Sequence, residues 1–235
     1  MNRALVLAAL RQRLTSPVRL LLLAFSFGPT ALMSCLSGTL AFVHGDAVKF
    51  AMILAAGSIG QDVSSGVLQL TFARPVSRPS YVLSRWFAAG AGGALLAFAQ
   101  LLAVAAVLAS RGVAAPVPDV LVALLEAALL SFAAAAVLIM FSSFVNGLGD
   151  VAVFFVLVLF AQAAGQVATF KHWAIVERAC AEINRTLWPD VHVAWLAGHG
   201  TPAWTDLVTL LSTVAIALSV AIVVVNRKEL SYAAD

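Results

Sequence analysis

The sequence predicts an all-α integral membrane protein with six transmembrane helices, an interfacial helix at the N-terminus, a short cytoplasmic helix between spans two and three, and short outer helices between spans five and six. Hydrophobic residues make up 62% of its 235 residues and charged residues only 11%, whereas roughly a quarter of an average soluble domain is charged. The mean hydropathy is +1.00. The basic residues stand at the ends of apolar runs, so we expect membrane lipid as a partner and no nucleic acid.

The first 16 residues predict a helix that lies on the inner membrane surface. Leucines are interspersed there with Arg3, Arg11 and Arg13, and the segment ends at Ser16 and Pro17. We expect the three guanidinium groups to reach anionic lipid headgroups. A disordered tail is the alternative interpretation.

Six apolar segments follow, each close to the ~20 residues that cross a ~30 Å hydrocarbon layer as a helix. Backbone polar groups must be satisfied within lipid, so helices are the expected form. The predicted spans are residues 18–43, 47–65, 82–109, 119–142, 150–169 and 204–225.

The placement of Lys and Arg predicts the orientation, because cytoplasmic loops are enriched in these residues. With six spans, nine of the 14 fall on one side, which we take as cytoplasmic: Arg3, Arg11, Arg13, Arg19, Arg74, Arg78, Arg85, Arg227 and Lys228. Both termini and residues 60–85 are therefore expected in the cytoplasm. We expect the membrane to be the cytoplasmic (inner) membrane of a bacterium.

Residues 60–85 are the one place where charge, proline and polar residues collect between long apolar runs. Asp62 ends the second apolar run, and Gly66 permits a bend. An apolar stretch too short to cross a bilayer follows, and Arg74 and Pro75 close it. We call residues 66–80 the coupling segment, for the role given next.

The coupling segment resembles the cytoplasmic coupling region of type 2 ABC exporter permeases. Those proteins carry an acidic residue, polar positions, Gly-Thr-Leu-Glu, an apolar stretch, Arg-Pro-Val-Ser-Arg and then a Tyr. The matching positions are Asp62, Ser65, Gly66, Leu68, Arg74, Pro75, Val76, Ser77 and Arg78. Val67 replaces the usual Thr and Gln69 the usual Glu.

The resemblance implies that residues 1–235 are one transmembrane permease domain with a cytoplasmic coupling helix, and that the chain is half of an ATP-driven exporter. Two such units, identical or related, would form the pathway with two ATPase subunits. The residues implied in ATPase coupling are Asp62, Gly66, Leu68, Arg74, Pro75, Ser77 and Arg78. We expect Asp62, Arg74 and Arg78 to hold the coupling segment through charge-assisted hydrogen bonds.

The sequence contains no phosphate-binding loop of the Gly-x-x-x-x-Gly-Lys-[Ser/Thr] type. We therefore expect a non-enzymatic subunit without a cofactor of its own, with ATP and Mg bound by the partner ATPase.

Residues 170–203 form the longest segment predicted outside the cell. Residues 171–187 have mostly helical apolar spacing, and Trp188 and Pro189 end that helix. In the permeases that the chain resembles, this region caps the pathway, which implies an outer gate at Trp173, Trp188 and Pro189. A periplasmic partner could also bind here.

Glu126 lies within the fourth predicted span, where a charge is costly and usually faces a cavity or a partner. With Gln100, Gln162 and Gln166 it could form a polar substrate pathway. A hydrogen bond between helices that only fixes packing is the alternative.

The four histidines are His44, His172, His192 and His199, and their spacing matches no metal-ligand template, so we predict no metal site. Residues 57–60, Gly-Ser-Ile-Gly, lack the order of an intramembrane serine protease, and small residues for helix packing explain them better.

Two further functional classes remain as alternatives. The chain could relay ATPase motion to an envelope partner through residues 170–203 without moving a substrate itself. A secondary transporter is the other class, but it predicts internal repeats and more buried ionisable residues than this sequence contains.

Overall fold

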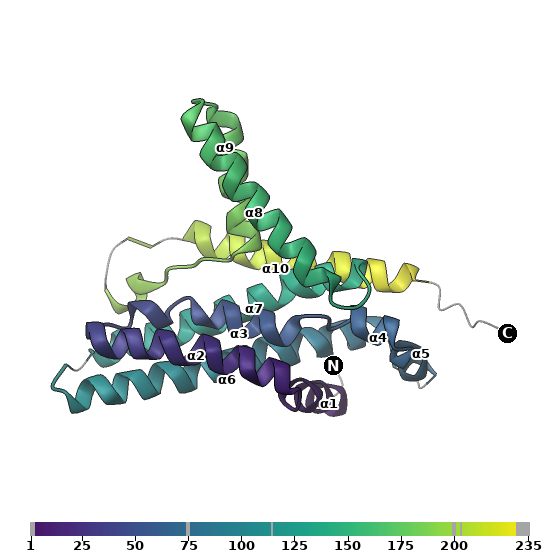
Figure 1. The fold of residues 1–235 in the computed structure, drawn as a ribbon, viewed down its shortest axis with the longest axis horizontal. Coiled ribbons are helices and arrows are strands. Elements are labelled where there is room, and N and C mark those ends of the chain that lie inside the picture. Colours follow the sequence, from purple (N-terminus) through teal and green to yellow (C-terminus); the bar gives the residue numbers. More distant parts are fainter. Residues whose placement is uncertain (1–2, 74–75, 114, 199–200, 203, 229–235) are drawn as a thin grey trace.

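A computed structural model describes residues 3–73, 76–113, 115–198, 201–202 and 204–228, and every regular element within them is a helix (Figure 1). Before the third span these are α1 (Arg3–Leu14), α2 (Pro17–Ser37), the 3₁₀ helix η1 (Ala41–Val43), α3 (Asp46–Ala55), α4 (Gly60–Ser64) and α5 (Val67–Phe72). The rest are α6 (Arg78–Ser110), α7 (Val117–Phe144), α8 (Gly149–Phe170), α9 (Ala174–Leu187), the 3₁₀ helix η2 (Ala194–Ala197) and α10 (Trp204–Arg227).

Five helices are long and apolar enough to cross a membrane: α2, α6, α7, α8 and α10. They correspond to the predicted spans one, three, four, five and six. The chain is therefore a multi-helix membrane protein with five candidate spans. The first of them ends at Ser37, before the predicted boundary at residue 43, because Gly38 adopts a left-handed φ of 74° that closes the helix.

The predicted second span, residues 47–65, is not one helix. It is interrupted between α3 and α4, and we call residues 56–59 the helix break. With 10 residues, α3 is only ~15 Å long, about half of a hydrocarbon layer. Gly57 supplies the turn with a φ of +64°, a conformation that residues with a side chain rarely adopt.

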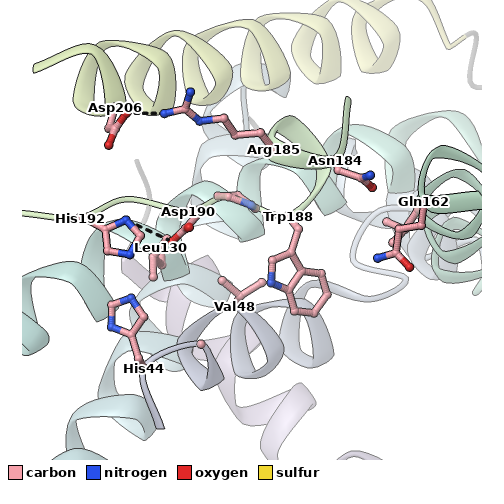
Figure 2. Close-up of a pocket in the computed structure, with 13 residues that line it drawn as sticks. His44, Val48, Leu130, Gln162, Asn184, Arg185, Trp188, Asp190, His192 and Asp206 are labelled. Carbon is pink, nitrogen blue, oxygen red and sulfur yellow. Dashed lines mark hydrogen bonds and ion pairs between the residues drawn. The ribbon is translucent and has the colours of Figure 1, made fainter. Parts of the chain in front are cut away.

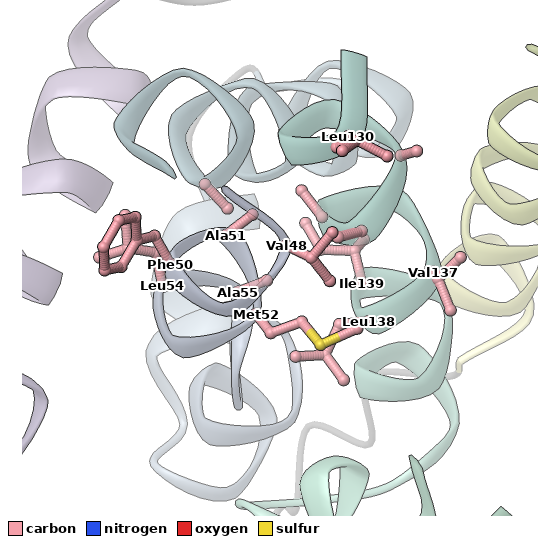
Figure 3. Close-up of a cluster of buried hydrophobic side chains, with 14 of the residues drawn as sticks. Val48, Phe50, Ala51, Met52, Leu54, Ala55, Leu130, Val137, Leu138 and Ile139 are labelled. Atoms are coloured by element: carbon pink, nitrogen blue, oxygen red, sulfur yellow. The ribbon is translucent and has the colours of Figure 1, made fainter. Parts of the chain in front are cut away.

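The core lies where α3 packs between α6 and α7. Figure 3 shows Val48 and Met52 of α3 directed toward Leu138 and Ile139 of α7. On the other side of α3 the backbones approach closely, since a Cβ on Gly93 of α6 would stand 2.8 Å from the Cα of Ala51. Small residues thus permit the close helix packing that membrane proteins use in place of a hydrophobic driving force.

Two parts of the fold lie at its margins. The N-terminal segment forms the predicted helix, α1, which packs mainly on α6. Residues 170–203 contain the predicted helix as α9, which packs mainly on α8, and this pair leans away from the other helices (Figure 1). The short helix α5 lies at the same end of the molecule as α1 and the end of α10 (Figure 1).

Candidate functional site

The coupling segment contains a single short helix, α5, between the bend at Gly66 and the start of α6. Gly66 has a φ of +72°, a left-handed conformation, and separates α4 from α5. The side chain of Leu68 points inward and is 2% exposed, whereas that of Leu70 is 72% exposed. The helix therefore presents Leu70, and to a lesser extent Val67 at 38% exposure, to its surroundings, while Leu68 fixes it to the fold.

Asp62 joins α4 to α6 inside the protein. Its carboxylate is buried, accepts a hydrogen bond of 2.5 Å from the hydroxyl of Tyr81, and forms an ion pair with Arg85. The ring of Tyr81 also packs edge-on against Phe72 of α5, with 5.5 Å between the ring centroids. Asp62 thus holds the coupling segment from within and offers no exposed carboxylate to a partner.

Arg78 joins the first turn of α6 to the end of α10. Its Nη1 donates to the carbonyl oxygens of Val225 at 3.1 Å and Asn226 at 2.6 Å, and its guanidinium lies 5.6 Å from the centre of the Phe72 ring. A cation is favoured there because helix C-termini carry partial negative charge. Ser77 is the exposed N-cap of α6, while Arg74 and Pro75 lie outside the described residues.

Two arginines bind the carbonyl end of α3 at the helix break. Arg13 donates to the carbonyl of Ala56 at 2.6 Å and of Gly57 at 3.1 Å, and Arg19 donates to the same Ala56 oxygen at 3.1 Å. Both also reach the side chain of Gln61. The prediction that Arg13 reaches lipid headgroups is wrong, because its side chain is buried against this break.

Burial, followed by the nearby guanidinium groups of Arg19 and Arg85, lowers the pKa of Arg13 to about 10. Arg13 therefore remains charged at neutral pH and offers charge-assisted hydrogen bonds to the carbonyls of Ala56 and Gly57, the second of which also accepts from the backbone N–H of Gln61.

The other side of the helix break is held by α7 and the start of α8. The hydroxyl of Ser142 accepts from the backbone N–H of Ile59 at 3.0 Å and of Gly60 at 3.1 Å. The buried carboxylate of Asp150 accepts from the N–H of Gly57 at 2.7 Å. Buried backbone polar groups at the end of a helix need such partners, and here they come from α7 and α8.

The four residues proposed for a polar pathway do not form one cluster. Gln100 is buried and donates to Asp46 at 2.8 Å, and Glu126 accepts from the backbone N–H of Val193 at 2.5 Å. Gln162 and Gln166 lie exposed on α8. Gln100 and Glu126 thus fix neighbouring segments in this structure.

A cavity of about 640 Å³ lies between α3, α7, α8 and the chain that follows α9 (Figure 2). It is lined by Gln162, which was predicted for the polar pathway, and by Trp188 and Pro189, which were predicted for the outer gate. The third predicted gate residue, Trp173, does not line it. Further lining side chains are His44, Val48, Leu130, Asn184, Arg185, Asp190, His192 and Asp206. Across this cavity Arg185 forms an ion pair with Asp206, which connects α9 to α10.

Sequence reasoning missed the residues that surround the helix break, namely Arg13, Arg19, Ser142 and Asp150. The available signal was a pair of glycines, Gly57 and Gly60, within a single apolar run. Small residues do serve packing there, as predicted, because a Cβ on Gly60 would stand 2.4 Å from the carbonyl oxygen of Val145.

Comparison with protein-family models finds no match, and no curated protein matches the chain. The resemblance to type 2 ABC exporter permeases therefore rests on the residues in and around the coupling segment and on the layout of the apolar segments.

Proposed function

We propose that the chain is the transmembrane permease subunit of an ATP-driven exporter of the ABC type, and that a separate ATPase docks on α5. The observation that carries the proposal is the exposed apolar side chain of Leu70 on a short helix whose inner side is tied to two long helices. Such a helix is suited to bind in a groove of a partner and to transmit the partner's movement to the long helices.

Named contacts supply a route for that displacement. From α5 it would reach α6 through the packing of Phe72 on Tyr81, and α10 through Arg78. It would reach α4, and with it the helix break, through the ion pair of Asp62 with Arg85. These contacts connect the six-residue helix α5 to the candidate spans α6 and α10, and to α4 beside the helix break.

The proposal includes a topology. The end of the molecule with α1, α5 and the end of α10 faces the cytoplasm of a bacterium, and α3 with α4 makes a sixth, interrupted crossing. Interrupted helices at membrane depth are tolerated where protein surrounds them, as the arginines, Ser142 and Asp150 do here. The exposed apolar faces of α2 and α8 are then available to lipid and to a second permease copy.

The experiment is gentle purification of the tagged chain from its native membrane, with mass spectrometry of the co-purifying polypeptides and an assay of ATP hydrolysis. We expect a stoichiometric ATPase that carries a phosphate-binding loop. Leu70→Asp should release it, because a charge would be placed in an apolar contact.

Val113→Asp is the matched control, since Val113 is 49% exposed and lies in the connection from α6 to α7. It should retain the ATPase. Recovery of other membrane complexes without any ATPase on this chain would contradict the proposal, and uptake into vesicles without ATP would then support a secondary transporter.

One observation favours relay of force to an envelope partner as a second function. The apolar side chain of Ile175 on α9 is 86% exposed, and α9 packs mainly on α8. An envelope protein that co-purifies with the chain and is lost in Ile175→Asp would support this function. If substrate moves in vesicles that contain only the permease and the ATPase, the relay is excluded.

A further inference from the structure

Two histidines and one aspartate that are far apart in the sequence meet on one wall of the cavity. His44 lies between η1 and α3, whereas Asp190 and His192 lie in the connection from α9 to η2. Each side chain offers one ligand atom, and these atoms lie within 4.8 Å of one another. The two imidazole rings stack with 5.8 Å between their centroids (Figure 2).

The surroundings of His44 favour a free lone pair at Nε2. Its Nδ1 lies 3.3 Å from Oε2 of Glu126, which is itself buried. A carboxylate at that distance favours a proton on Nδ1, the nitrogen that faces it. The Nε2 atom is buried and has no hydrogen-bond partner within the part of the chain that the structure describes. A buried nitrogen with an unused lone pair needs a partner, and a metal ion is one partner to which it can donate that lone pair.

We propose that His44, Asp190 and His192 bind a divalent transition-metal ion of the Zn²⁺ class, and that Glu126 orients His44. Two imidazoles and a carboxylate suit Zn²⁺ and its neighbours in the first transition row, whereas Ca²⁺ and Mg²⁺ prefer oxygen ligands alone. Histidines that bind a metal usually contact a carboxylate through their other ring nitrogen, and Glu126 supplies that carboxylate to His44. Three protein ligands leave one tetrahedral position open.

The separations of the three ligand atoms show how far the side chains must move to bind an ion. Tetrahedral ligands at ~2.1 Å from an ion stand roughly 3.4 Å apart, so no pair of these ligand atoms, all within 4.8 Å of one another, must approach by more than roughly 1.4 Å. Asp190 and His192 can make that shift, because their side chains are 57% and 63% exposed on a stretch without regular secondary structure.

An ion at this site would join the start of α3 to the chain that follows α9. The cavity wall would then be fixed to the arm formed by α8 and α9. This inference does not rest on the proposed function, because it needs neither an ATPase nor a transported substrate.

The test uses the full chain, purified with a tag that contains no histidine, stripped with a chelator and titrated with Zn²⁺ against a chromophoric chelator. We expect one ion per chain and an X-ray absorption spectrum with imidazole nitrogens at ~2.0–2.1 Å. His192→Ala and Asp190→Ala should each weaken binding at least tenfold, and their exposed positions make misfolding a minor concern.

Two further variants distinguish a specific metal site from adventitious binding of the ion. Glu126→Gln should weaken binding by roughly 10- to 100-fold through loss of the carboxylate that orients His44. His172→Asn removes a histidine outside the cluster and should change nothing; Asn tolerates its φ of 54°. Failure to retain one ion per chain, or equal binding by the wild type, His192→Ala and Asp190→Ala, would overturn the proposal.

Discussion

Ser142 provides the sharpest test of how the helix break is stabilised. Its hydroxyl is the acceptor for two backbone N–H groups at the start of α4, Ile59 and Gly60. The first N–H groups of a helix have no partner within it, so Ser142→Ala leaves both unpaired and buried. Each such group costs about 1–3 kcal/mol, and the better helix propensity of Ala returns about 0.5 kcal/mol. For the two groups together we expect a net loss of about 1.5–5.5 kcal/mol in the free energy of unfolding.

Ser131→Ala is the matched control. Ser131 lies on the same helix, is equally buried, and makes a hydrogen bond of 3.1 Å with the carbonyl of Ala47. That carbonyl lies in the first turn of α3 and keeps its bond within the helix, so the loss should be about 1 kcal/mol or less. The assay is denaturant unfolding of both variants in mixed micelles. Equal losses for Ser142→Ala and Ser131→Ala would refute the account of the helix break.

Gly60→Ala should destabilise the protein by about 1–3 kcal/mol, because its Cβ would stand 2.4 Å from the carbonyl oxygen of Val145, a backbone atom that cannot move aside. Gly28→Ala is the control, since nothing lies within 4 Å of its Cβ, and it should be neutral or slightly stabilising in the same unfolding assay. Arg85→Gln should cost about 3–5 kcal/mol by leaving the buried carboxylate of Asp62 without its cation, and adding Asp62→Asn should recover much of that loss. If the double variant is no more stable than Arg85→Gln alone, the ion pair is not the cause.

The long helices were predictable because apolar runs of about 20 residues have one stable form in lipid. Leucines interspersed with arginines placed α1, helical apolar spacing placed α9, and the bend at Gly66 together with the family resemblance placed a short helix before Arg78. These features depend on neighbours in the sequence: composition, spacing, and the glycine or proline that ends an element.

The helix break was not predictable from its own residues. Hydrophobicity continues through Ala56 and Ile59, so the run reads as one span. What stabilises the interruption comes from far along the chain, since Arg13 lies 43 residues before Ala56 and Asp150 lies 93 residues after Gly57. For the same reason the spacing of the histidines did not reveal His44 beside His192.

Arg78 and Asp62 illustrate an intermediate case. The sequence identified both as residues that hold the coupling segment, and both make charge-assisted contacts in the structure. Their partners, the end of α10 and Arg85, are set by tertiary packing. A motif thus located these side chains, but only the fold defined what they hold.

The most direct measurement is site-specific cross-linking in native membranes, with a photoreactive amino acid at position 70 on α5. A matched probe at position 160 on α8 serves as control, because Leu70 and Phe160 are both highly exposed apolar residues. We expect the probe at position 70 to capture an ATPase with a phosphate-binding loop, and the probe at position 160 to capture lipid or a second permease copy. Capture of no ATPase at position 70, or equal capture at both positions, would contradict the claim that α5 is the docking element of an ATP-driven permease.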